Sequence, residues 1–153
     1  MSISIRKTAA AVLAAGVVAV PMLTASSASA SNAERTVVVY LSNLSGCTMT
    51  RAAASLSHGV WTITPAVQIA NNTTSEWESE SNGVLTGTEG TATYVLGNCA
   101  NPAQNAKLAI FHWDNPYVGS NTYDTSGTTP GVNIVRKGGS GDNAIVNWLV
   151  RTS

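Results

Sequence analysis

Short runs of β-branched and aromatic residues, separated by turn-forming residues, recur along most of the chain. The first, residues 36–41, is apolar on nearly both faces, which is typical of a strand in the middle of a sheet. Further strands are predicted at 60–63, 66–69, 74–80, 91–96, 106–113, 132–136 and 144–150. Spacing of about 8–12 residues between turn signals predicts an all-β fold, an antiparallel β-sandwich or barrel. Only residues 51–56 fit a helix by composition, and a strand fits that segment equally well.

The segment from Gly139 to Ala144 matches the G-x-G-x-x-A pattern of dinucleotide-binding loops. Such a loop must open a helix, so that backbone N–H groups face the pyrophosphate. A β-branched and aromatic run follows here instead. The segment is therefore interpreted as the loop of a β-hairpin between 132–136 and 144–150.

Residues 1–30 have the pattern of a secretion signal. Arg6 and Lys7 precede an apolar run that is interrupted by Pro21, and 26–30 offers a small-residue cleavage site. The run is short for a membrane-spanning helix. We expect cleavage after Ala30, secretion, and a single domain over 31–153.

The charge of the chain limits its partners. Charged residues make up 10 % of the sequence, with eight bases and eight acids. Residues 1–30 contain two bases and no acid. Once they are removed, 31–153 carries six bases and eight acids, a net charge of −2. This balance argues against nucleic-acid binding and against simple attraction to anionic lipids.

Cys47 and Cys99 both lie in the exported part, where a structural disulfide is the default for two cysteines. Two free thiols or metal ligands are the alternatives. His58 and His112 show no metal-binding spacing with the cysteines, so no metal and no cofactor are predicted.

Glu76, Glu78 and Glu80 alternate along the run 74–80, so they project from one face. They are interpreted as a solvated face that keeps an edge strand from aggregating. The alternative is that they lie beside a site for a cationic group.

Aromatic residues gather at the end of the run 106–113 and in the turn-rich segment after it. Trp113, Tyr117 and Tyr123 either pack into the core or form an exposed surface for a ligand or lipid, because Trp and Tyr faces attract ammonium groups. The other tryptophans inside predicted strands are explained by core packing: Trp61, Trp77 and Trp148. His112 and Asp114 could pair, but no G-x-S-x-G elbow accompanies them, so no enzyme is predicted.

Four segments together resemble the aegerolysins, in particular bacterial members related to small insecticidal crystal proteins. They are SHGVW at 57–61, WESESNG at 77–83, TGTEGTATY at 86–94 and HWDNPYVGSN at 112–121. The W-D-x-P motif in the last segment is the most specific. The resemblance spans roughly 36–150.

The resemblance implies a β-sandwich of the actinoporin type and binding to membrane lipids, such as sphingolipid headgroups in sterol-rich domains. It also implies haemolytic or insecticidal activity together with a perforin-like partner. Carried over by motif, it places His112, Trp113, Asp114 and Tyr117 at a headgroup site, and Trp77 less specifically.

Two departures from the family pattern stand out. Asn115 occupies a position where fungal members commonly have cysteine, so their cysteine pairing does not transfer. Only residues 31–35 precede the first strand after cleavage, too few for the amphipathic helix with which actinoporins form pores.

The prediction is therefore a secreted protein that binds membrane lipids through His112, Trp113, Asp114, Tyr117 and Tyr123, with Trp77 as a weaker candidate. A secreted carbohydrate- or protein-binding module is the alternative, because aromatic platforms with Asn and Asp side chains also suit sugars.

Overall fold

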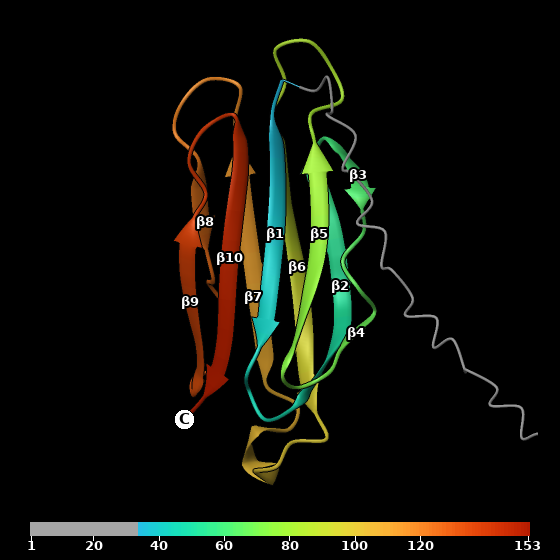
Figure 1. Cartoon of the computed structure of the whole chain (residues 1–153), viewed down its shortest axis with the longest axis vertical. Coiled ribbons are helices and arrows are strands. Elements are labelled where there is room, and N and C mark those ends of the chain that lie inside the picture. The colour runs from blue at the N-terminus through green and yellow to red at the C-terminus, as the bar shows by residue number, and fades with distance from the viewer. Residues whose placement is uncertain (1–33) are drawn as a thin grey trace, which may run out of the picture.

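The computed structural model describes residues 34–153, which form two five-stranded sheets packed face to face (Figure 1). The strands are β1 (Thr36–Asn43), β2 (Thr48–His58), β3 (Val60–Ile63), β4 (Gln68–Ile69), β5 (Thr73–Glu80), β6 (Thr88–Gly97), β7 (Leu108–Asn115), β8 (Thr122–Asp124), β9 (Val132–Gly138) and β10 (Asn143–Thr152), with one 3₁₀ turn, η1 (Pro102–Gln104). The predicted signal at 1–30 lies outside the described residues. None of the helical structure in 34–153 is long and apolar enough to cross a membrane.

The front sheet in Figure 1 has the order β3-β5-β1-β10-β9, and the sheet behind it has the order β4-β2-β6-β7-β8. β1 lies in the middle of its sheet, as its two apolar faces predicted. The all-β sandwich is confirmed, with one departure from antiparallel pairing: β1 and β10 run parallel. Parallel neighbours need a long crossover, and here the rest of the fold connects the first strand to the last.

Three local predictions changed once the strands paired. Segment 51–56 is strand, because β2 pairs with β6 along almost its whole length and tertiary pairing overrides helix propensity. The predicted strand 66–69 shrinks to Gln68–Ile69. The three-residue β8 was not predicted, since turn formers surround it. The hairpin interpretation of 139–144 is confirmed by the antiparallel pairing of β9 with β10.

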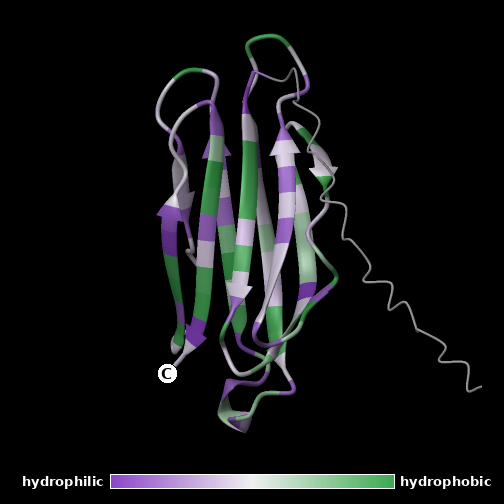
Figure 2. Ribbon diagram, viewed as in Figure 1, coloured by the Kyte–Doolittle hydropathy of each residue, from purple (hydrophilic) through white to green (hydrophobic). Residues whose placement is uncertain are grey.

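The core between the sheets is unusually aromatic. Buried and less buried residues alternate along β6 and β7, as expected when alternate side chains point inward. Figure 2 shows bands of hydrophobic and hydrophilic residues along the strands. Rings of Trp77, Phe111 and Trp148 pack edge-to-face across the interior, with centroids 5.6–6.1 Å apart. The prediction that Trp77 and Trp148 are core residues is confirmed, and Trp61 packs against the same cluster while half-buried.

A disulfide joins Cys47, between β1 and β2, to Cys99, just after β6. The predicted bridge is therefore confirmed. It ties two connections together at the lower end of the sandwich in Figure 1, beside η1. The opposite, upper end carries no such link among residues 34–153.

The acidic strand β5 is not an edge strand, which corrects the interpretation of its three glutamates. It lies between β3 and β1. β3 is short, however, and pairs only with the stretch from Glu78 to Glu80. The half of β5 from Thr73 to Trp77 therefore has an uncovered edge, and Glu76 projects from that half.

Candidate functional site

The upper end of the sandwich, here called the loop end, brings together three loops that are far apart in the sequence (Figure 1). They are the β5–β6 loop (81–87), the β7–β8 loop (116–121) and the β9–β10 loop (139–142). Val84 and Val118, at the tips of the first two, are each 82 % exposed, and Leu85 is 60 % exposed. These two valines are the most exposed of the large apolar side chains in the described part of the chain, and apolar side chains left in solvent on one end are candidates for an interaction surface.

A groove of about 340 Å³ is lined by residues of both loops, Leu85–Gly87 on one side and Pro116–Tyr117 on the other. Leu85 and Tyr117 contribute apolar and aromatic surface to it. Glu89 and Asp114 contribute carboxylates, and His58 lies at its rim. The groove is therefore both acidic and aromatic, which is the chemistry that attracts an ammonium group.

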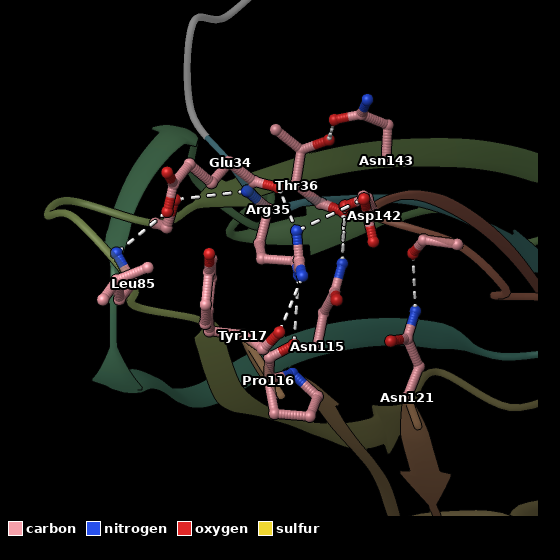
Figure 3. A network of polar contacts seen from close by, with 12 residues as sticks. Glu34, Arg35, Thr36, Leu85, Asn115, Pro116, Tyr117, Asn121, Asp142 and Asn143 are labelled. Carbon is pink, nitrogen blue, oxygen red and sulfur yellow. Dashed lines mark hydrogen bonds and ion pairs between the residues drawn. The ribbon is translucent and has the colours of Figure 1, made fainter. Parts of the chain in front are cut away.

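The β5–β6 loop is held against the β7–β8 loop under local strain. Leu85 has a φ of +58°, which is costly for a branched side chain. Its N–H donates to Glu34 Oε2 over 2.9 Å (Figure 3). At Gly87 a Cβ would lie 2.5 Å from the Asn115 carbonyl oxygen, so only glycine permits this approach. These constraints keep Leu85 out in solvent rather than folded onto the core.

Arg35 fastens the β7–β8 loop to the start of β1. Its Nε donates to the Pro116 carbonyl over 3.1 Å, and its Nη2 donates to the Tyr117 carbonyl over 2.7 Å. Its Nη1 lies 3.3 Å from Asp142 Oδ2, and its guanidinium sits 4.9 Å from the Tyr117 ring centroid. Figure 3 shows the Tyr117 ring between this guanidinium and Leu85. One arginine thus orients the ring that lines the groove.

Asn115 locks the same region from within. It is 1 % exposed, and its Nδ2 donates to the carbonyls of Thr36 and Asp142, over 3.0 and 2.8 Å (Figure 3). It therefore joins β7, β1 and the β9–β10 loop. At this position the family pattern has cysteine in fungal members, and a cysteine side chain could not donate to two carbonyls at once.

A chain of histidines and carboxylates lies on the outer face beside the groove. Glu89 Oε2 is 3.1 Å from His58 Nδ1, and Glu89 Oε1 is 3.2 Å from His112 Nε2. On its other side His112 Nδ1 lies 3.1 Å from Asp124 Oδ2, a close approach without the alignment of a hydrogen bond. Both ring nitrogens of His112 therefore face carboxylates, which orients Glu89 at the edge of the groove.

The two groove carboxylates have opposite shifts in pKa. Hydrogen bonds from His112 and then His58 hold the pKa of Glu89 below its ordinary 4.5. Burial, followed by the charge of Glu89, raises the pKa of Asp114 above its ordinary 3.8. Asp114 pairs with Glu89 across neighbouring strands, so the two carboxylates concentrate negative charge at one place.

A second hollow, of about 520 Å³, lies on the other side of Pro116, between the β7–β8 and β9–β10 loops. Arg35 and Arg136 both line it. The guanidinium of Arg136 lies 4.8 Å from the Tyr123 ring centroid. Asp142 also lines this hollow and pairs with Arg35, so its lining holds two arginines and one acid. The loop end therefore has an acidic groove and, beside it, a hollow with an excess of basic side chains.

The family model of the aegerolysins matches residues 43–147, across both sheets and all three loops of the loop end. The chain belongs to the aegerolysin family. No curated protein sequence matches it significantly. The crystal structure of the lipid binding protein Nakanori is similar in fold, with a TM-score of 0.62 at 15 % identity, covering 76 % of this chain and 70 % of that one.

In this aegerolysin, Asp114 and Tyr117 line the groove together, as the W-D-x-P motif predicted for a site. His112 lies behind them on the outer face of β7 and contacts Glu89 instead of the groove. Tyr123 is half-buried against Trp148, and its hydroxyl donates to the Gly139 carbonyl over 2.9 Å. It borders the basic hollow.

The tryptophans proposed for lipid contact lie in the core, which corrects that part of the prediction. Trp113 and Trp77 are both 0 % exposed, and their ring centroids are 6.0 Å apart. Trp113 Nε1 donates to Ser79 Oγ over 3.0 Å, inside the sandwich. Strand alternation explains the error, because Asp114 points outward on β7 and its neighbour Trp113 must point inward.

Sequence reasoning missed the residues at the loop tips. Val84, Leu85 and Val118 stand in turn-rich segments without strand alternation. Isolated apolar residues between glycines and a proline are the signal that could have found them. Arg35 left no signal, because its contacts come from residues about 80 positions away.

Lowering the pH should change the contributions of Glu89 and Asp114 to stability in opposite directions, a loss for Glu89 and a gain for Asp114. A carboxyl group whose pKa is lower in the folded state than in the unfolded state stabilises the fold at higher pH, and this stabilisation is lost as the pH falls below about 4.5. A carboxyl group whose pKa is raised in the folded state stabilises the fold more as the pH falls. We expect Glu89→Gln to flatten the fall in unfolding free energy below that pH, and Asp114→Asn to steepen it. Urea titrations monitored by circular dichroism at several pH values measure both slopes. Equal slopes in all three proteins would contradict the assignment.

Proposed function

We propose that this aegerolysin binds zwitterionic membrane lipids, of the sphingolipid type in sterol-rich domains, through its loop end. The observation that carries the proposal is the acidic and aromatic groove lined by the two loops that also carry the exposed apolar residues Val84, Leu85 and Val118. Membership of the aegerolysin family and the fold shared with a lipid binding protein support it.

In the proposed mode the tips Val84, Leu85 and Val118 enter the interfacial layer of the bilayer. The headgroup ammonium enters the groove, where Glu89 and Asp114 supply negative charge and Tyr117 supplies a ring face. The phosphate faces the hollow that contains the two arginines. A headgroup without a cationic end would not be attracted to the acidic groove. The net charge of −2 over residues 31–153 likewise disfavours simple attraction to anionic lipids.

We propose secretion as the route to the target membrane, with residues 1–30 removed. We also propose that haemolytic or insecticidal damage requires a larger perforin-like partner. Every strand of 34–153 is paired within the two sheets, so insertion of any of them into a bilayer would first break a sheet. Under this proposal the aegerolysin selects the lipid and the partner supplies the pore.

Removing the apolar tips should weaken binding to membranes. Burying one valine stabilises by about 1.5 kcal/mol or more, which corresponds to roughly tenfold in affinity. We therefore expect Val84→Ser and Val118→Ser each to lower liposome affinity about tenfold, and the double variant to lower it further. Cosedimentation with sphingomyelin–cholesterol and ceramide phosphoethanolamine liposomes measures the effect.

Val67→Ser is the matched control, because Val67 is 66 % exposed but lies between β3 and β4, outside the loop end. It should bind as the wild type does. Asp114→Asn should lower the affinity for zwitterionic vesicles and leave the affinity for vesicles of uncharged lipids unchanged. Absence of cosedimentation with every composition would refute the proposal, and tight glycan-array hits in that case would favour the carbohydrate-binding alternative.

A further inference from the structure

The outer face of the front sheet holds charged residues that the fold itself leaves unused. Of the six bases in 34–153, four donate to backbone carbonyls: Arg35, Arg51, Lys107 and Arg136. Lys137 on β9 and Arg151 on β10 have no hydrogen bond or ion pair within the described chain, and both project from this face. The glutamates of β5 project from the same face and are equally unpaired within 34–153: Glu76, Glu78 and Glu80.

The glutamates on β5 and Lys137 on β9 lie toward opposite margins of this face, whereas Arg151 lies on the more central strand β10. Strand pairing places Glu76 beside Tyr40, Tyr40 beside Asn147, and Asn147 beside Lys137, in one row across β5, β1, β10 and β9. Three strand spacings separate the two ends of the row, roughly 14 Å. Glu76 and Lys137 therefore cannot neutralise each other within one molecule.

Apolar side chains lie between the two charged margins. Ile145 on β10 is 55 % exposed, and Val38 on β1 and Leu149 on β10 are half-buried. Val135, which is 51 % exposed, continues this apolar surface onto β9, beside Leu149. Figure 2 shows the front sheet from this side, with hydrophobic bands along β1, β10 and β9. An apolar centre with charged margins is the usual layout of a protein–protein interface.

We propose that a second copy of this chain packs on this face, about a two-fold axis that runs along the strands between β1 and β10. Such an axis exchanges the two margins, so β5 lies over β9 and Glu76 faces the partner's Lys137. The symmetry repeats the contact, giving two ion pairs at the rim of one isologous interface. Val38 then faces Ile145 of the partner subunit, near the axis.

The charge pattern selects this arrangement over the other face-to-face one. A two-fold axis perpendicular to the strands would place β5 over its own copy, with acid against acid, at a cost in like-charge repulsion. The axis along the strands also leaves both loop ends pointing the same way. A dimer would then present two loop ends to one membrane, which raises its avidity. That consequence rests on the proposed lipid binding, whereas the dimer itself does not.

Charge reversal tests the interface without any lipid. Sedimentation velocity over two decades of concentration should show a monomer–dimer equilibrium that weakens with salt. Glu76→Lys and Lys137→Glu should each raise the dimer Kd by about tenfold or more. An equal mixture of the two variants should restore dimers, because each heterodimer regains two opposite-charge contacts.

Thr50→Lys is the control, since Thr50 is exposed on the other sheet, and it should leave the dimer Kd unchanged. Circular dichroism checks that every variant is folded. A wild-type protein that stays monomeric throughout, or an oligomer that neither single variant weakens, would overturn the proposal. A mixture that fails to restore dimers would overturn the stated orientation.

Discussion

Trp113→Ala is expected to lower the free energy of unfolding by about 3–5 kcal/mol. The Trp113 ring is fully buried, 5.6 Å from the Trp61 centroid and 6.0 Å from the Trp77 centroid. Its removal leaves a large cavity in the aromatic core and removes the N–H that donates to Ser79 Oγ. Since small proteins have only about 5–15 kcal/mol of stability, urea denaturation followed by circular dichroism should show a large shift in the midpoint.

Trp113→Phe is the milder variant of the same position. It keeps most of the apolar volume but loses the indole N–H and the five-membered ring, which leaves a smaller cavity, so a loss of about 1–2 kcal/mol is expected. A change below about 1 kcal/mol in the alanine variant would mean that the ring is not a core residue. For the same reason, lost liposome binding in Trp113→Ala would report unfolding, and the tip variants Val84→Ser and Val118→Ser are the proper probes of the membrane contact.

The double variant Cys47→Ala/Cys99→Ala should lose about 3–4.5 kcal/mol of stability. The bridge closes a chain segment with a sequence separation of 52, so its loss returns conformational entropy to the unfolded state. The melting temperature and the urea midpoint, compared with those of the wild type with and without a reducing agent, measure the effect.

Removal of the disulfide should lower stability without lowering lipid affinity. The bridge lies at the end of the sandwich opposite the groove, so liposome binding well below the melting temperature should match that of the wild type. An affinity loss in a protein shown to be folded would contradict this separation of stability from binding.

Much of the architecture was predictable because strands leave a local signal. Runs of β-branched and aromatic residues between turn formers marked β1, β5, β6, β7, β9 and β10, and two apolar faces marked β1 as central. The local signal failed where stability comes from distant partners. β2 is a strand because β6 pairs with it, and β8 is too short to show a period of two.

The candidate site was only partly predictable. The W-D-x-P motif pointed to Asp114 and Tyr117, which do line the groove. The same motif suggested Trp113, although strand geometry turns adjacent side chains to opposite faces. The groove also depends on Glu89, oriented by His112 and His58, and such cross-strand contacts follow from register rather than from sequence spacing.

By itself the sequence indicated the class of fold and the family, because hydrophobic periodicity and motifs are local signals. It also made a disulfide between Cys47 and Cys99 the default, because an exported chain with two cysteines has only one possible internal bridge. Only the tertiary structure decided which side chains reach solvent and which charges meet. Strand register turned Trp113 inward, the Arg35 clamp and the strained backbone of Leu85 kept the loop tips outside, and strand order set Glu76 and Lys137 on opposite margins of one face. These outcomes depend on contacts between residues that are distant in the chain, and no local pattern encodes them.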